Sequence, residues 1–225
     1  MQIIPVIDLK DGLVVHAVRG NREYYQPIHQ NSQLTDSSDI HTVLGRFLQL
    51  YPFKQFYIAD LNAISGFGSH QVLIDDVLQS YPDIHFWLDN GCQFSEIKPG
   101  QPNLQQVIGT ESQQLPPTVA TKDYILSLDY KDQQRKGPAV WFEQSAYWPD
   151  VVIAMTLNQV GSDSGPDKEK LIQLQRAHPK KKWVAAGGVR NQSDLVWLEK
   201  NGIHSALLAT ALHNGSINKQ ILQSL

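Results

Sequence analysis

Short apolar stretches recur along the chain, and most of them are apolar on consecutive residues instead of alternate ones. This pattern is typical of strands that are buried on both faces, as in parallel sheets. It predicts eight strands, at Ile3–Ile7, Gln55–Ala59, His85–Leu88, Gln106–Ile108, Tyr124–Leu128, Val151–Ala154, Trp183–Ala186 and Ser205–Leu208.

Helical periodicity separates most of these stretches, because apolar residues recur there every three or four positions. Pro166 is predicted to open one helix, and Asn191 is predicted to cap another that ends before Gly202. The helical segments are expected at residues 40–48, 73–78, 140–142, 166–174, 191–202 and 217–225.

Two connections are too interrupted to hold a long helix. The one after the third strand contains Pro99, Gly100 and Pro102, and the one after the fourth contains Pro116 and Pro117. Eight strands alternating with helices, two of them shortened, predict a single (β/α)8 TIM-barrel domain over residues 1–225. The shortened third and fourth helices explain a chain below the roughly 250 residues typical of that fold.

The two halves of the chain resemble one another where corresponding strands end. This repeat predicts two similar half-barrels, with Asp8 and Asp129 facing one pocket from opposite strands. The matching pairs are Ile7–Lys10 with Leu128–Lys131, Ile58–Asn62 with Ile153–Asn158 (one residue longer), Asn90–Gln93 with Gly187–Arg190, and Gly109–Thr110 with Ala209–Thr210.

Composition narrows the class of protein. The net charge of −3, from 19 basic and 22 acidic side chains, gives no indication of nucleic-acid binding. A single cysteine excludes an internal disulfide and favours a reducing compartment. No apolar run approaches the roughly eighteen residues of a membrane span, so we expect a soluble cytoplasmic protein. The eight histidines lack ligand spacing, and neither a metal nor another cofactor is expected.

Two strand ends have the residues of a phosphate site. Gly187, Gly188 and Arg190 follow the seventh strand, and Ala209 and Thr210 follow the eighth. Glycines allow backbone N–H groups to approach an oxyanion, and in TIM barrels the loops after the last two strands commonly hold phosphate. We therefore predict a phosphorylated small-molecule substrate, with a tight strand–helix turn as the alternative for the glycines.

Four motifs together resemble the HisA/HisF family of histidine biosynthesis, and the resemblance covers nearly the whole chain. They are Ile4–Gly12, Ile108–Ser112, Ser127–Asp129 and Ala186–Val189. The resemblance implies an enzyme on a TIM barrel. The HisA branch isomerises an aminoaldose phosphate, ProFAR (phosphoribosylformimino-5-aminoimidazole carboxamide ribotide), to the aminoketose, whereas the HisF branch is a cyclase.

The resemblance to the isomerase also implies catalytic residues. Asp8 and Asp129 match its acid and base, and Thr156 is the nearest match to its threonine after the sixth strand. Ring opening needs a proton donor and enolisation needs a proton acceptor, and two carboxylates across the substrate can supply both. Further residues expected to bind substrate are Arg19, Arg22, Asp60, Asp89, Asn90, Gly91, Gly109 and Thr110.

Two departures from the isomerase pattern leave the function open. The loop Asn90–Gln93 lacks the family's arginine, and loss of that phosphate site would exclude ProFAR, which carries two phosphates. The segment His16–Tyr25 is similar to a subgroup of methanogens and methylotrophs that is associated with tetrahydromethanopterin biosynthesis. The alternatives are a lyase or cyclising enzyme acting on a monophosphorylated precursor, or a phosphate-ligand binder without catalysis. The oligomeric state, including a homo-oligomer, is left open.

Overall fold

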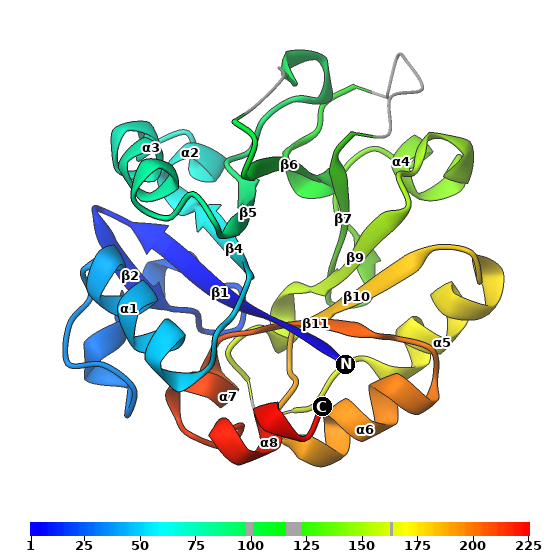
Figure 1. Cartoon of the computed structure of the whole chain (residues 1–225). Helices are drawn as coiled ribbons and strands as arrows, with labels where there is room; N and C mark the ends of the chain where they lie inside the picture. The colour runs from blue at the N-terminus through cyan, green and yellow to red at the C-terminus, as the bar shows by residue number, and fades with distance from the viewer. Residues whose placement is uncertain (98–100, 116–122, 163) are drawn as a thin grey trace.

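All eight apolar stretches are strands in the computed structural model, which describes residues 1–97, 101–115, 123–162 and 164–225. Parallel pairing of the last strand with the first closes the ring, and Figure 1 shows the helices outside it. The fold is therefore the predicted (β/α)8 barrel. Around the ring its strands are β1 (Gln2–Lys10), β4 (Gln55–Asp60), β5 (His85–Asp89), β6 (Leu104–Gly109), β7 (Ile125–Lys131), β9 (Val151–Thr156), β10 (Lys182–Ala186) and β11 (Ser205–Leu208).

Helices follow the strands as the periodicity predicts. Asn191 caps its helix by accepting a hydrogen bond from the Asp194 amide at 3.1 Å, as expected. Pro166 does not open the neighbouring helix, because Asp167 caps it by accepting from the Lys170 amide and the first helical residue is Lys168. The α-helices are α1 (Ile40–Leu50), α2 (Leu61–Ser65), α3 (Gln71–Ser80), α4 (Val140–Glu143), α5 (Lys168–Ala177), α6 (Gln192–Lys200), α7 (Thr210–His213) and α8 (Lys219–Gln223).

The third and fourth connections are shortened, as predicted. Within the described residues, β5 and β6 are followed only by single 3-10 turns, η3 and η4. Pro99, Gly100, Pro116 and Pro117 lie outside the described residues. The 3-10 turns are η1 (Arg22–Tyr24), η2 (Ile28–Gln30), η3 (Phe94–Glu96), η4 (Thr110–Ser112), η5 (Ser145–Tyr147) and η6 (Leu157–Gln159).

Side chains of each barrel strand point alternately into the barrel and outward to the helices. In β1, Ile4 belongs to the apolar cluster inside the barrel, whereas Ile3 and Ile7 pack beneath the helices. Because both faces are covered, the strands are continuous apolar runs in the sequence. The alternation also decides which strand-end residues face inward: Asp8 lies four positions after Ile4 and therefore points into the barrel.

The pairing register confirms two similar half-barrels. Asp8 pairs with Ala59 on the next strand, and Asp129 pairs with Met155, so the two halves superpose strand by strand. This register makes Asp60 equivalent to Thr156, and the extra residue expected in the second half is therefore wrong. Each half also begins with a hairpin, in which β2 (Leu13–His16) pairs with β1, and β8 (Gln134–Arg135) pairs with β7. A further short strand, β3 (Gln26–Pro27), pairs with β2.

Membrane insertion through a helix has no structural basis in the described part of the chain. Among those residues, no helix has both the length and the apolar character needed to cross a bilayer.

Candidate functional site

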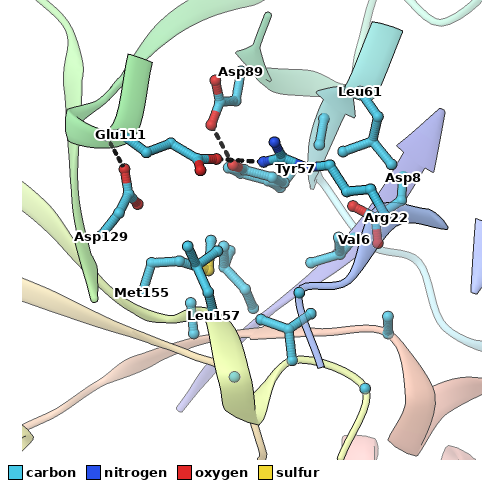
Figure 2. Close-up of a pocket in the computed structure, with 18 of the residues that line it drawn as sticks. Val6, Asp8, Arg22, Tyr57, Leu61, Asp89, Glu111, Asp129, Met155 and Leu157 are labelled. Carbon is cyan, nitrogen blue, oxygen red and sulfur yellow. Dashed lines mark hydrogen bonds and ion pairs between the residues drawn. The ribbon is translucent and has the colours of Figure 1, made fainter. Parts of the chain in front are cut away.

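A cavity of about 410 Å³ opens at the carboxyl ends of the barrel strands. Asp8 and Asp129 line it from β1 and β7, which are separated by three strands in either direction around the ring. Figure 2 shows the two carboxylates on opposite sides of the cavity, with Asp89 and Glu111 between them along one wall. Residues from six further segments complete the lining, including Arg22, Tyr57, Lys131, Lys136, Met155 and Leu157.

Asp129 is held in one orientation by three hydrogen-bond donors. The Ser127 hydroxyl donates to Oδ1 at 2.7 Å, and the Glu111 amide donates to Oδ2 at 2.9 Å. The Thr110 hydroxyl lies 3.3 Å from the same Oδ2. Burial raises the pKa of Asp129 well above its ordinary value, and the negative charge of Glu111 adds to the rise although the amide and Ser127 oppose it. Asp129 is therefore a positioned carboxyl group that favours its protonated form.

Asp8 is buried like Asp129 but has no such support. Its side chain is 9% exposed, and it accepts no hydrogen bond from any residue in the described ranges. Burial raises its pKa from 3.8 to about 7, Arg22 lowers it in part, and the charge of Asp89 raises it further. A carboxyl group that titrates near neutrality can gain or lose a proton at the pH where most enzymes operate.

A third carboxylate, Asp89, lies beside this pair. The Tyr57 hydroxyl donates to its Oδ2 at 3.0 Å and the Gly91 amide to its Oδ1 at 3.2 Å. Burial, followed by the charge of Glu111, raises the pKa of Asp89 to about 6. Gly109 allows this crowding, because a Cβ there would lie 3.2 Å from the Asp89 carboxylate and 3.3 Å from that of Asp129.

An ion pair that the sequence did not reveal crosses the rim. The Arg22 guanidinium binds the Glu111 carboxylate, and the two side chains are 31% and 24% exposed, respectively. Glu111 follows the Gly109–Thr110 motif directly, which is the one local signal that could have indicated it. Tyr57 was also missed, although its inward position two residues before Ala59 follows from the alternation of β4.

The loop after β10 has the geometry of an anion site. Gly187 and Gly188 have positive φ of 101° and 81°, and a Cβ on Gly188 would lie 2.1 Å from the Gly165 carbonyl oxygen. Together with Ala209 and Thr210 they line the cavity. Within the described residues, the backbone N–H groups of 188, 189 and 209–211 donate to no protein acceptor in turns or loops, whereas the register of β10 and β11 uses the Gly187 amide in the strand ladder. Unpaired amides at strand ends and helix starts are the usual ligands of a phosphate group.

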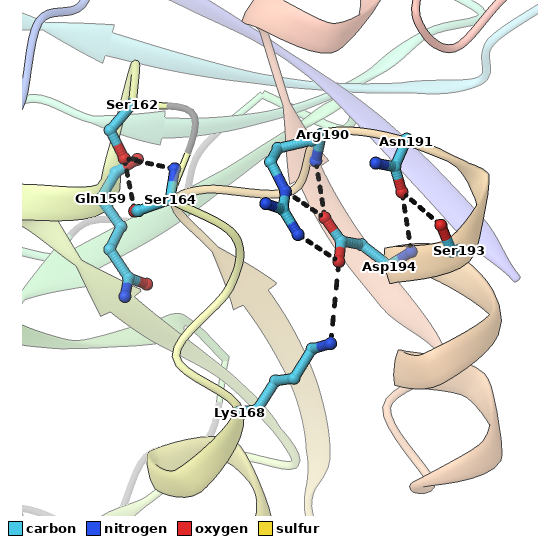
Figure 3. A network of polar contacts seen from close by, with 8 residues as sticks. All are labelled: Gln159, Ser162, Ser164, Lys168, Arg190, Asn191, Ser193 and Asp194. Carbon is cyan, nitrogen blue, oxygen red and sulfur yellow. Dashed lines mark hydrogen bonds and ion pairs between the residues drawn. The ribbon is translucent and has the colours of Figure 1, made fainter.

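Arg190 lies outside the lining of this cavity. Its guanidinium donates to both carboxylate oxygens of Asp194, from Nε at 2.9 Å and from a terminal nitrogen at 3.1 Å, and its backbone amide donates to Asp194 as well. Lys168 approaches the same carboxylate at 3.9 Å, as Figure 3 shows. The side chain of Arg190 thus fixes the start of α6, behind the glycines.

The equivalent loop in the first half is closed by its own side chains. The Cys92 amide donates to the Asn90 side chain at 3.3 Å, and Gln106 donates to the same oxygen at 2.9 Å. The Gly91 amide is bound by Asp89, and the Gln93 amide by Glu96. The amides that could have held a second phosphate are therefore already occupied.

Three other residues expected at the site lie elsewhere. Asp60 is fully buried and caps α2 by accepting from the Ala63 amide at 3.1 Å, and it also binds His70. Thr156, its equivalent, is buried outside the cavity lining, as the strand alternation requires. Arg19 lines a shallow hollow at the rim that shares Lys131 with the main cavity.

These features define a TIM barrel with a carboxylate-bearing cavity at the strand ends where barrel enzymes have their active sites. The chain belongs to the histidine biosynthesis protein family, whose model matches residues 2–98 and 141–218. The unmatched part, 99–140, contains β6 and β7 and therefore Asp129. The equivalence of Asp129 to Asp8 rests on the register within this chain.

Three relatives show how far the likeness extends. An uncharacterized protein of Methanocaldococcus jannaschii is 29% identical over 224 residues, covering 97% of this chain and 96% of its own. A 1-(5-phosphoribosyl)-5-((5-phosphoribosylamino)methylideneamino)imidazole-4-carboxamide isomerase of Leuconostoc mesenteroides is 24% identical, covering 96% and 95% of the two chains. The isomerase of that name from Halothermothrix orenii is 22% identical, covering 99% and 98%.

These relatives place the chain in a family that includes isomerases of a substrate with two phosphoribosyl groups. None of the three names refers to tetrahydromethanopterin, and that part of the resemblance stays a prediction.

Proposed function

We propose that this protein is an acid–base isomerase that converts a phosphorylated aminoaldose into the aminoketose. The observation that carries the proposal is the pair Asp8 and Asp129, which face one cavity from opposite strands and both have raised pKa values. The open amides beside Gly187 and Gly188 support binding of the substrate phosphate at the same cavity. Buried carboxyl groups with raised pKa values in a cavity are typical of acid–base catalysis, which favours an enzyme over a ligand-binding protein without catalysis.

The two carboxyl groups differ in a way that suits two roles. Asp129 favours its protonated form and would deliver a proton to the ring oxygen, so that the sugar opens to a Schiff base. Asp8, with a pKa of about 7, would then remove the proton from C2. The electron pair of the C2–H bond forms the enol-amine. Asp8 then returns its proton to C1 while the C2 hydroxyl proton passes to the Asp129 carboxylate, which gives the ketose and restores both groups. Arg22 counteracts the rise in the Asp8 pKa and keeps part of that group ionised near neutral pH.

A second candidate follows from the closed loop of the first half. Asn90 and Asp89 occupy the amides that would hold a second phosphate, which favours a substrate with one phosphate over ProFAR. In that case the protein is a lyase or cyclising enzyme acting on a monophosphorylated precursor, such as one leading to a one-carbon carrier. The same acid–base pair would serve such a reaction.

The test is turnover of ProFAR by the purified protein and by two variants, Asp8→Asn and Asp129→Asn. Asp36→Asn is the matched control, because the Asp36 side chain is 89% exposed and lies far from the lining residues in the sequence. Turnover that is lost in both site variants and kept in the control establishes the isomerase. If the native protein leaves ProFAR unchanged while inorganic phosphate raises its Tm, isomerisation of ProFAR is refuted and the second candidate stands.

A further inference from the structure

The two ends of the cavity have opposite chemistry. The end formed by β10 and β11 presents the unpaired amides next to Gly188 and Thr210. The end formed by β5 presents the carboxylate of Asp89, with Asp8 of β1 and Asp129 of β7 facing each other across the cavity on either side of it. The repeat relates these ends, because the register makes Asp89 equivalent to Ala186.

The charges at the acidic end do not cancel among themselves. Arg22 is one positive charge, paired with Glu111 and acting also on Asp8 and Asp89, whereas Asp8, Asp89, Glu111 and Asp129 all line the cavity. The other cations of the lining, Lys131 and Lys136, come from the hairpin of β7 and β8 and are half-buried at its rim. Burying carboxylates together is costly without a partner for their charge.

Asp8 shows where such a partner is missing. Asp89 and Asp129 each accept hydrogen bonds at both oxygens, from Tyr57 and Gly91 and from Ser127 and Glu111, respectively. Asp8 lines the same space, is 91% buried, and accepts none from the described residues. A buried carboxylate normally has a hydrogen-bond donor, so its open oxygens indicate that a donor arrives with the ligand.

We infer that this end of the cavity binds a protonated amino group, and that the substrate class is an amine-bearing phosphate monoester. The inference rests on the proposed phosphate site at Gly187 and Gly188. An ammonium group brings N–H donors and one positive charge, which match the open oxygens of Asp8 and the negative charge of the neighbouring Asp89.

Other occupants fit this end less well. A second phosphate would bring about two negative charges against three carboxyl groups, in a loop whose amides are already bound to Asp89 and Asn90. Among the described residues, no three His, Cys, Asp or Glu side chains are placed to hold a metal ion together. An organic cation remains the partner that the charges and the hydrogen-bond donors both favour.

The experiment measures affinity by calorimetry for three series of equal chain length: ω-aminoalkyl phosphates, ω-hydroxyalkyl phosphates and α,ω-alkyl bisphosphates. Inorganic phosphate is the reference. We expect the best amine to bind about tenfold tighter than its hydroxyl counterpart, as for one charged hydrogen bond, and the bisphosphate to bind weakest. In Asp8→Asn the amine and its hydroxyl counterpart should bind with about equal affinity, while the affinity for inorganic phosphate stays unchanged.

The outcomes separate this inference from the function on which it rests. If amine and hydroxyl compounds bind equally, or the bisphosphate binds tightest, the amino-group site is refuted while the phosphate site stands. If neither inorganic phosphate nor any monoester binds, or Gly188→Ala binds them as well as the native protein, the phosphate site is refuted and the inference falls with it. Asp89→Ala gives this position the alanine that the second half has at 186, and it removes one negative charge from this end of the cavity without changing Asp8.

Discussion

Replacing Asp8 with asparagine should stabilise this protein at alkaline pH and leave its stability at acid pH unchanged. Asp8 is buried in the cavity wall without a hydrogen-bond donor from the described residues, and its pKa is about 7 compared with an ordinary value of 3.8. The folded state therefore binds the proton more tightly than the unfolded state, and the ionised group destabilises the fold.

The magnitude follows from the shift. Each pKa unit corresponds to about 1.36 kcal/mol, so a rise of about three units costs the folded protein roughly 4 kcal/mol once both states are ionised. The sign is fixed by the raised pKa of the folded state. The free energy of unfolding attributable to Asp8 is unaffected below about pH 4, falls between pH 4 and 7, and stays low above pH 7.

The assay is denaturant unfolding of the native protein and of Asp8→Asn across this pH range, with Asp36→Asn as the exposed control. The free energy of unfolding of Asp8→Asn should exceed that of the native protein by up to about 4 kcal/mol at pH 8 and should equal it near pH 4. The control should have the free energy of unfolding of the native protein at every pH. A gain below about 1 kcal/mol at pH 8 would refute the burial argument. A gain of equal size at both pH values would show that packing, and not ionisation, had changed.

Three further predictions test other parts of the site and fold. Arg22→Gln removes the charge that lowers the pKa of Asp8, so the stabilisation by Asp8→Asn measured in that background should keep growing above pH 7 and reach a larger final value; a stabilisation that levels off near pH 7 at the same value would show that Arg22 does not act on Asp8. Gly188→Ala places a Cβ 2.1 Å from the Gly165 carbonyl oxygen, and should lower the Tm and abolish the rise in Tm that phosphate produces. Gly45→Ala lies in α1 with no atom within 4 Å of the new Cβ, and should raise the free energy of unfolding by about 0.5–1 kcal/mol without affecting phosphate binding.

The fold could be predicted from the sequence because its signals are local. Strands buried on both faces give continuous apolar runs, and caps such as Asn191 lie next to the helices they start. The inward direction of Asp8 and Asp129 could be read in the same way, from the two-residue period counted from Ile4 and Ile125. Counting the same period would have turned Asp60 and Thr156 outward.

The rest of the site depends on contacts between distant residues, which the sequence does not display. The Arg22–Glu111 ion pair joins residues 89 positions apart, and Gln106 reaches the Asn90 loop from the next strand. Whether a loop such as Asn90–Gln93 is open or closed is decided by these partners. Arg190 was expected to bind phosphate because it follows the glycines, but its guanidinium donates to Asp194 and is thereby held away from the cavity lining.

The two half-barrels diverge at positions that act together. The register makes Asp89 equivalent to Ala186, Gly109 to Ala209 and Glu111 to Ala211, so the carboxylates of Asp89 and Glu111 have methyl groups as their counterparts. Gly109 differs from Ala209 for the same reason. A Cβ at position 109 would crowd the carboxylates of Asp89 and Asp129, whereas Ala209 can carry a Cβ because Asp89 is replaced by an alanine in its half of the barrel. One half therefore keeps its amides open for an anion, while the other closes them and gathers negative charge. This asymmetry argues that the ligand has chemically different ends.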